Sequence, residues 1–543
     1  MKDDLPLLVE TGNGFSIKYR KKTLYSLADP VRGAERLANS CEIKNKTLIF
    51  IPSPLLFYGV DSILKDMPED CHIICVEVDQ NLMALSIKNT IPDLLKHPKI
   101  TYFRTDDIGH IAYVLTKIGL WKFRRTVKIV LNGGSSLYSI PYDSMFGLIE
   151  REIQSYWQNK ITLIRIGRKL INNLFINLNH LTESYCFTGF STSKSVLIAG
   201  AGEGLETSLP FIKKERKRFF ILAVDTSLPV LLKNRISPDL VLILESQFAN
   251  IFDFYDTKNS TIPILCDLTS YPGVIKNFKG KKYFFISEFD KTKIFSRLKN
   301  RKLLPEVFSP AGSVGILAVD IALKITKAPI LITGLDFSYK IGKPHAKGSF
   351  SHVFSLINIK RFNPIPMYKT SLARPLFRVN DKNNKTCITD KILYAYSLLL
   401  NKLISDKKNI FDINPGAGVF YGGRKIEKDQ ILTITGNPES SSDSLLSNTA
   451  STVEKGDILD FLNNEKSILS SIVDISKKIL NRGIAEKDKT RIEELLSEAD
   501  YVFIDFPDTP PILLGDINFY KRIIISAENY LIKINQAIQL TEL

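Results

Sequence analysis

The stretch that most constrains the fold is Ser195–Thr207, where an apolar run meets a tight cluster of glycines. The run Ser195–Ala199 stops at Gly200-Ala-Gly-Glu-Gly204, and a helix-like segment follows. A second apolar run, Phe219–Val224, then ends on Asp225. A strand, a glycine turn, a helix and a strand that ends in a carboxylate form the first half of a nucleotide-binding α/β unit.

Each part of this unit has a chemical use. Gly200, Gly202 and Gly204 allow the backbone to approach a phosphate closely, and the helix that follows offers free N–H groups and a positive dipole end. Asp225 lies about 20 residues further on, where such folds meet a ribose hydroxyl. The spacing departs from the dinucleotide fingerprint, because Leu205 stands where the last glycine would be. The alternative interpretation is a glycine-rich turn that binds nothing, since short motifs discriminate weakly.

Length and hydropathy limit the architecture. The chain has 543 residues, enough for two to four domains at about 100–200 residues each. No apolar run approaches the roughly 18 residues that a membrane-spanning helix needs. The first residues lack the apolar core of a signal peptide. We therefore expect a cytoplasmic protein without a membrane span.

The cysteines and the charge exclude two further classes. The six cysteines are scattered, and several lie in apolar runs, so we expect reduced, buried thiols and no metal site. The net charge of +16 raises the possibility of nucleic-acid binding. The basic residues are spread out and are not interleaved with aromatics in a recognised module. We therefore expect no nucleic acid, and an anionic small substrate or an acidic partner instead.

Residues 1–185 predict a Rossmann-like N-terminal domain. Apolar runs at Thr47–Ile51, His72–Val78 and Thr126–Leu131 alternate with helical segments, as in an α/β fold. A glycine turn is missing after the first run, where Pro52-Ser-Pro54 removes backbone donors. This domain is expected to have a structural or partner-binding role and not to bind a nucleotide.

Residues 191–428 predict a central α/β domain whose strands end in polar residues. Because ligands bind beyond the carboxyl ends of parallel strands, Asp225, Glu245 and Asp336 are expected to converge near the glycine turn. The alternative is that such residues are only helix N-caps, which is the interpretation we favour for Asp267. Thr386–Ile404 is predicted to be a helix.

The irregular stretch after Asp336 is expected at the edge of the site. It contains His345, and histidine is the usual general base near neutral pH. Tyr339 and Lys343 either meet a phosphate or face water. Further along, 429–455 reads as a linker by composition. Residues 456–543 show helical periodicity and no catalytic motif, so a helical C-terminal domain is predicted.

At this point the chain resembles the motility accessory factor (Maf) family of flagellin glycosyltransferases, which carries the DUF115 region. The resemblance extends to about Arg424 and rests on pieces in family order. They are Leu27-Ala-Asp-Pro-Val-Arg-Gly-Ala-Glu-Arg-Leu37, Arg165-Ile-Gly-Arg168 with Asn173, Gly200-Ala-Gly-Glu-Gly-Leu-Glu206, Ser237-Pro-Asp239, Gly312-Ser-Val314, Gly334-Leu-Asp-Phe337 and His345-Ala-Lys-Gly348.

The resemblance implies a sialyltransferase-like central domain. It implies transfer of a nonulosonic (sialic-like) acid from a CMP-activated donor to Ser or Thr of flagellin, without a metal cofactor and with His345 as the base. Asp336 would orient the loop or the base. The donor would be held by Gly200, Gly202, Glu203, Gly204, Asp225, Glu245, Gly312, Ser313, Tyr339 and Lys343. Glu203-Gly204 replaces the family's Pro-Ser, which removes a hydroxyl and adds a charge that would repel a phosphate unless it points away.

Two rival functions remain open. An archaeal branch of the wider family is a pterin pyrophosphokinase, and in that case Asp225, Glu245 and Asp336 would hold Mg²⁺ between phosphates. The other is a flagellin chaperone or export-linked scaffold without catalysis, which is consistent with the altered glycine turn.

Overall fold

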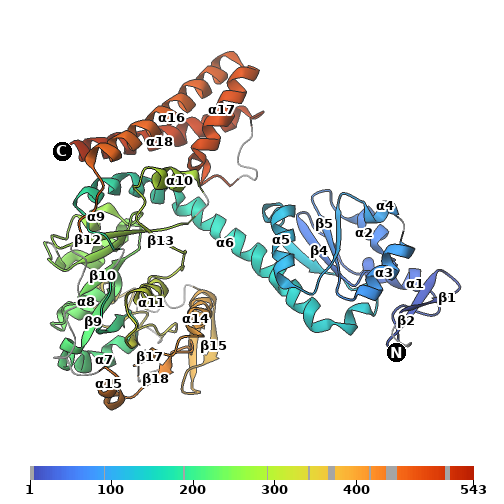
Figure 1. Ribbon diagram of the computed structural model, residues 1–543, viewed down its shortest axis with the longest axis horizontal. Coiled ribbons are helices and arrows are strands. Elements are labelled where there is room, and N and C mark those ends of the chain that lie inside the picture. The colour runs from blue at the N-terminus through green and yellow to red at the C-terminus, as the bar shows by residue number, and fades with distance from the viewer. Residues whose placement is uncertain are drawn as a thin grey trace. The chain divides into compact units, whose positions relative to one another are not determined.

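The structure is a computed structural model that describes residues 5–90, 92–187, 190–257, 259–289, 292–339, 343–364, 374–414, 418–435, 449–507 and 514–543. It divides into two compact units (Figure 1). They are Met1–Arg165 with Asp505–Ile512, and Ile166–Ile504 with Leu513–Leu543. The division falls inside one long helix, α6 (Ser139–Asn177), whereas the boundary expected from the sequence at 185 lies beyond the end of that helix. Both units are α/β with parallel sheets, which confirms the predicted fold class.

The first unit is built on a parallel sheet with strand order β6-β5-β4-β7. Its strands are β4 (Thr47–Pro52), β5 (His72–Glu77), β6 (Ile100–Arg104) and β7 (Arg125–Lys128). The inner two are apolar at 48–51 in β4 and 73–76 in β5, because helices cover both faces. One face carries α1 (Pro30–Ala38) and α2 (Val60–Asp66), and the other carries α5 (Ile108–Ile118) and the first part of α6. The remaining elements are β1 (Leu7–Glu10), β2 (Phe15–Tyr19), β3 (Lys22–Thr23), α3 (Gln80–Asn89) and α4 (Pro92–Leu95).

The carboxyl end of this smaller sheet is filled by its own side chains. Ser53 has a positive φ of 50° between its two prolines, and its hydroxyl donates to Glu77 Oε2 over 2.7 Å. The other oxygen of Glu77 accepts from Tyr142 and from two backbone amides. The acid at the end of the second strand is therefore occupied by protein donors, which fits the expectation that this domain binds no nucleotide.

The second unit is organised around a parallel sheet in which the described residues form nine strands, in the order β13-β12-β11-β10-β9-β8-β14-β17-β18. The bounds are β8 (Ser195–Ala199), β9 (Phe219–Val224), β10 (Leu240–Ile243), β11 (Ile264–Asp267), β12 (Lys282–Ser287), β13 (Glu306–Phe308), β14 (Ile330–Thr333), β17 (Ile410–Asp412) and β18 (Arg424–Lys425). The chain builds outward from β8 to β13 and then returns to add β14 on the other side of β8. The gap between β8 and β14 is thus the topological switch point, where open α/β sheets bind ligands.

Helices cover both faces of this sheet (Figure 1). One face packs against α11 (Val314–Ile325) and α14 (Lys391–Ile404), and the other against α7 (Glu203–Lys214), α8 (Leu228–Lys233) and α15 (Lys428–Ile434). Shorter elements are α9 (Pro272–Ile275), α10 (Lys293–Asn300), α12 (Phe350–Ile357) and the hairpin β15 (Leu376–Asn380) with β16 (Thr386–Asp390). The first five residues of the helix predicted at Thr386 are therefore strand, and Asp390 caps α14 through the amides of Ile392 and Leu393.

The helical C-terminal region is as predicted. It consists of α16 (Lys455–Arg482), α17 (Glu486–Glu498) and α18 (Ile517–Glu542), and Arg297 of α10 pairs with the buried Glu465 of α16 at 2.6 Å. The segment expected to be a linker begins inside α15, where Ile431 is only 1% exposed in the core. Its stretch 436–448 lies outside the described residues. Within the described part, no helix has both the length and the apolarity to cross a membrane.

Candidate active site

The glycine turn lies at the switch point, directly against the end of β14. The Gly200 amide donates to the Thr333 carbonyl and the Gly202 amide donates to the Gly334 carbonyl, each over 2.8 Å. A Cβ at Gly200 or Gly202 would collide with the Gly334 backbone, and Gly334 itself has a φ of +71°. These glycines are therefore required because two backbone turns approach each other here.

Asp336 is the carboxylate that the structure brings to this turn. Its Oδ2 accepts from the Gly204 amide over 2.9 Å, and its Oδ1 accepts from Asn414 Nδ2 over 2.9 Å. Asn414 in turn accepts from the Thr333 hydroxyl and the Gly334 amide. Burial raises the pKa of Asp336 to about 6, although the Gly204 amide and Lys382 act to lower it. The carboxylate thus caps the N-terminus of α7 from inside the protein.

The expected phosphate cradle needs a correction at this point. The amides of Gly200, Gly202 and Gly204 all donate to protein oxygens, so a phosphate could take them only by displacing those oxygens. A Cβ at Gly204 would also come within 2.7 Å of Asp336 Oδ1. The glycines serve close packing of protein against protein, a requirement that produces the same sequence pattern as a nucleotide turn.

Charged groups surround the first turn of α7. Lys343 Nζ lies 2.7 Å from Glu206 and 3.9 Å from Glu203, so this lysine meets carboxylates. Glu206 also accepts from the Lys347 amide over 2.5 Å. Burial alone would raise the pKa of Glu206, but Lys343 and the Lys347 amide lower it below its ordinary value. Glu203 therefore faces a cation rather than an empty phosphate position.

His345 also lies at the glycine turn, as the sequence led us to expect. Its ring bonds the Ala201 carbonyl, and the neighbouring Ala346 amide donates to the same carbonyl over 2.8 Å. Burial lowers the pKa of His345 despite this hydrogen bond. The imidazole is therefore neutral at pH 7, the state that a general base requires.

Asp225 and Glu245 belong to a second group, at the carboxyl ends of β9 and β10. Asp225 accepts from the Thr226 amide over 2.8 Å and from Asn250 Nδ2 over 3.0 Å. Burial raises the pKa of Asp225 to about 6 and that of Asp253 to about 7, and the negative charge of Glu245 adds to both shifts. Sequence reasoning missed Asn250 and Asp253, because they lie in a 3-10 segment, η6 (Phe248–Thr257), beyond any strand end.

The remaining predicted donor contacts have local partners. The Tyr339 hydroxyl donates to Asp390 over 2.8 Å, and burial together with Asp390 raises the pKa of Tyr339 to about 12. Gly312 turns the chain with a φ of +66°, and Ser313 is the N-cap residue of α11. In the described residues, no three acidic, histidine or cysteine side chains gather as metal ligands. The triad that the magnesium alternative requires is therefore not assembled there.

Polar side chains near the site also hold the scaffold together. Asn173 and Asn177 lie one turn apart on α6, and each donates to two backbone carbonyls in the turns after β10 and β11, over 2.8–2.9 Å. The helix N-cap expected at Asp267 is wrong, because Asp267 ends β11 and the N-cap residue of the next helix, α9, is Tyr271. Asp267 accepts from Thr269 and from the Ser287 amide. These polar residues position the strand ends and need no ligand to explain them.

Comparisons with known proteins were made for the whole chain. The profile of the family described as 6-hydroxymethylpterin diphosphokinase MptE-like matches residues 169–342. An uncharacterized protein of Treponema pallidum (strain Nichols) is 31% identical over 350 residues, which cover 63% of this chain and 61% of that protein. A second uncharacterized protein of the same organism is 25% identical over 130 residues, which cover 22% of this chain and 60% of that protein. The chain therefore spans about three fifths of the length of each relative.

One solved structure matches almost end to end. The MAf glycosyltransferase from Magnetospirillum magneticum AMB-1 has a TM-score of 0.53 with this structure at 13% sequence identity. The match covers 99% of this chain and 91% of that one. At this identity the likeness shows a shared fold that includes both units and the helical C-terminal region.

Proposed function

We propose that this chain is a glycosyltransferase of the Maf type that transfers a nonulosonic (sialic-like) acid from a CMP-activated donor to Ser or Thr of flagellin. The observation that carries the proposal is a neutral histidine held at the glycine turn, at the switch point of a fold shared with a Maf glycosyltransferase over 99% of the chain. The shared fold includes the N- and C-terminal regions, which a nucleotide-binding domain alone does not need.

The proposed reaction is a single displacement at the anomeric carbon. His345 accepts the proton of the acceptor hydroxyl as that oxygen attacks, and CMP leaves with the bonding electron pair. Lys343 exchanges Glu206 for the departing phosphate, because a phosphate offers it a stronger charge partner. Asp225 and Glu245 bond sugar or ribose hydroxyls. Asp336 is a positioning residue, since both of its oxygens hold the turn and α7.

An aromatic surface beside the site favours a protein acceptor. Phe350 stacks on Phe252 with ring centroids 4.7 Å apart, which joins α12 to η6. Phe248 and Phe354 extend the surface, and they are 58% and 55% exposed. Because α12 follows the His345 loop and η6 carries Asn250, this surface adjoins both groups of site residues. Exposed aromatics that adjoin a site are typical of protein recognition.

A second candidate is a magnesium-dependent pterin pyrophosphokinase. The match to the MptE-like profile over 169–342 favours it, and so do the raised pKa values of Asp225 and Asp253. That reaction transfers a diphosphate from ATP and requires Mg²⁺. Metal dependence therefore separates the two candidates.

The first experiment measures the intact mass of flagellin co-expressed with this chain and a CMP-nonulosonate pathway. We expect a sugar-sized mass gain that His345→Ala abolishes and Asp336→Asn reduces. His352→Ala is a comparison variant, since His352 lies on α12 and interacts electrostatically with Lys343 and Glu206. His97→Ala is the matched control, because the His97 ring accepts from the Lys99 amide in the first unit. Loss of the gain in His352→Ala but not in His345→Ala would show that the base is assigned wrongly.

A result without any mass gain, with donor supply verified, would contradict the transferase. Purified protein would then be assayed for diphosphate transfer from ATP to 6-hydroxymethylpterin, with and without Mg²⁺. Activity only with Mg²⁺ would establish the second candidate. Absence of both activities, with flagellin still bound, would favour the non-catalytic chaperone.

A further inference from the structure

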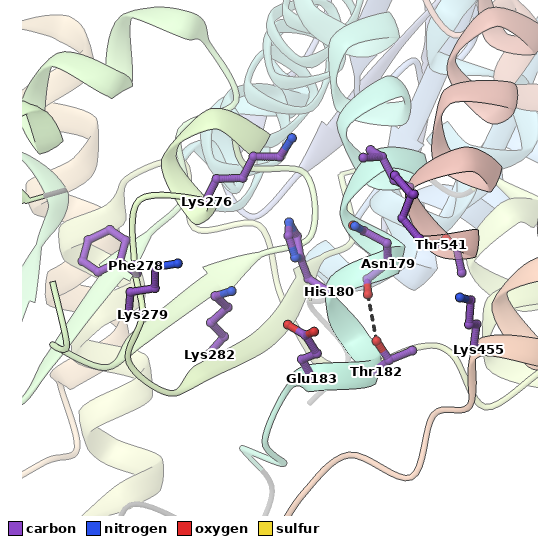
Figure 2. A pocket seen from close by; sticks show the side chains of 12 residues that line it. Asn179, His180, Thr182, Glu183, Lys276, Phe278, Lys279, Lys282, Lys455 and Thr541 are labelled. Carbon is purple, nitrogen blue, oxygen red and sulfur yellow. Dashed lines mark hydrogen bonds between the residues drawn. The ribbon is translucent and has the colours of Figure 1, made fainter. Parts of the chain in front are cut away.

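A separate cavity of about 560 Å³ lies in the second unit (Figure 2). Its walls are the 3-10 turn η3 (Leu178–Glu183), the turn between α9 and β12, the start of α16 and the end of α18. None of its lining residues belongs to the glycine turn, the His345 loop or the Asp225 group. Its volume falls within the roughly 300–1,000 Å³ typical of small-molecule sites.

The cavity is strongly basic on one side. Lys276, Lys279 and Lys282 line it from the turn before β12, and no ion pair of these three lysines is present among the described residues. Figure 2 shows Lys279 and Lys282 on one side of the cavity, with the side chain of Lys276 pointing away from them. Lys455 lines the opposite side, but its Nζ is already bonded to a backbone carbonyl of α18 over 2.5 Å. Glu183 is the single acidic side chain in the described lining.

Two buried polar atoms in the same wall have no hydrogen-bond partner in the part of the chain that the structure describes. They are His180 Nε2 and Asn179 Oδ1. The His180 ring lies parallel to Phe284 at 6.4 Å, which gives it a fixed orientation. Burial and the nearby Lys282 and Lys276 lower the pKa of His180 to about 4, so the ring is neutral and one nitrogen donates while the other accepts. Buried polar atoms are normally satisfied, and an unsatisfied one requires an explanation.

We propose that this cavity binds a compact polyanion, a small molecule that carries a diphosphate or two adjacent phosphate groups. Lys276, Lys279 and Lys282, which form no ion pair among the described residues, offer positive charges to the oxygens of such a ligand. His180 Nε2 donates to one of these oxygens when its proton is on that nitrogen. The cavity is independent of the proposed transferase reaction, and either proposal can fail without the other.

The test uses the full chain and inorganic pyrophosphate as the probe, titrated by calorimetry at low and high salt. We expect saturable binding that weakens with salt, as exposed lysine contacts require. Lys279→Gln with Lys282→Gln should weaken binding by about a hundredfold, since each of the two lost charge-assisted bonds contributes about 1.5 kcal/mol. The matched control is Lys407→Gln with Lys408→Gln, two exposed lysines after α14 in the same unit. Binding to this control should change by less than about twofold, because these lysines lie outside the cavity.

A second readout locates the ligand. The chain has six histidines, so the NMR signal of His180 can be assigned by its loss in His180→Gln. Pyrophosphate should shift that signal and leave the signal of His345 in place. The proposal is overturned if no saturable binding occurs up to millimolar probe, if both lysine pairs weaken binding equally, or if only the His345 signal moves.

Discussion

Replacing Asp225 with asparagine should stabilise the second unit at neutral pH. Asp225 is 4% exposed and has no basic side chain among its hydrogen-bond partners, only the Thr226 amide and hydroxyl and Asn250 Nδ2. Asparagine has the same shape and keeps the oxygen that the Thr226 amide requires. The Oδ1 atom of Asn250 is buried and has no partner among the described residues, so its amide can rotate and accept from the new NH₂ group. The substitution therefore removes a buried charge, and its cost is that the rotated Asn250 places its own NH₂ where Oδ1 lacked a partner.

The magnitude follows from the pKa of Asp225. Burial raises it from 3.8 to about 6, which corresponds to about 3 kcal/mol of unfavourable free energy for the ionised form in the fold. Because the folded-state pKa is above the unfolded value, this destabilisation is fully present above pH 7. It falls to about half near pH 5 and disappears below pH 4. Allowing for weaker hydrogen bonds to a neutral amide, we expect a gain of about 2 kcal/mol at pH 7.5 and under about 1 kcal/mol at pH 5.

The assay is urea unfolding of wild type and variant at pH 7.5 and at pH 5.0. Asp239→Asn is the matched control in the same sheet. Its carboxylate pairs with Arg216 at 2.8 Å and accepts from the Ile221 amide, so the control should lose stability. If Asp225→Asn lowers the free energy of unfolding at pH 7.5, or raises it equally at both pH values, the burial argument is refuted. A stable variant that no longer binds donor would indicate that Asp225 is retained for function.

Three further substitutions test the scaffold of the site. Gly204→Ala should lower the midpoint of thermal unfolding, because the new Cβ meets Asp336 at 2.7 Å and overpacking costs about 1–3 kcal/mol. Asn177→Ala should lower the free energy of urea unfolding by about 1–3 kcal/mol, since two backbone carbonyls that accept from Asn177 over 2.8 Å would lose their donor. Lys382→Met should lower the same quantity by about 3–5 kcal/mol, because it leaves Asp412 buried without its partner at 2.7 Å. Adding Asp412→Leu to that variant should recover much of the loss, and no recovery would contradict the ion-pair explanation.

The parallel strands were predictable because both of their faces are buried. Runs such as Ser195–Ala199 and Phe219–Val224 are buried throughout and, apart from Ser195, apolar, and the structure has strands with these same bounds. The sequence predicts a helix from Thr386, but Thr386–Asp390 is a strand of the hairpin. Its alternation of polar and apolar residues spans only five positions, and a strong helical pattern follows at once. Asp390 was the available signal, since an N-cap residue marks where a helix begins.

The candidate site was predictable only up to the strand ends. A carboxylate after β14 was expected near the glycine turn, and Asp336 lies there. Its second partner, Asn414, follows β17 and is 78 residues away in sequence. Nothing local marks that pairing, because it depends on β17 lying next to β14 in the sheet. Strand order is set by long-range packing. The hydrogen bond between Asn414 and Asp336 could therefore not be predicted from local sequence motifs.

The hydrogen bonds of Asp336 with Gly204 and Asn414 raise the question whether the switch point is a functional site or only a well-packed turn. A purely structural cap for the Gly204 amide needs one neutral oxygen, and an asparagine at position 336 would provide it. The chain instead buries Asp336 as an acid whose pKa is raised to about 6, which makes the ionised form costly at neutral pH. Asp225, directly after β9, and Asp253, in η6, carry the same kind of cost. Carboxylates with strongly raised pKa values at the carboxyl ends of a parallel sheet are more typical of catalytic or binding sites than of positions that only stabilise the fold. Under the proposed function, the donor would be bound through Lys343, Asp225 and Glu245 rather than through the glycine amides, which donate to protein oxygens.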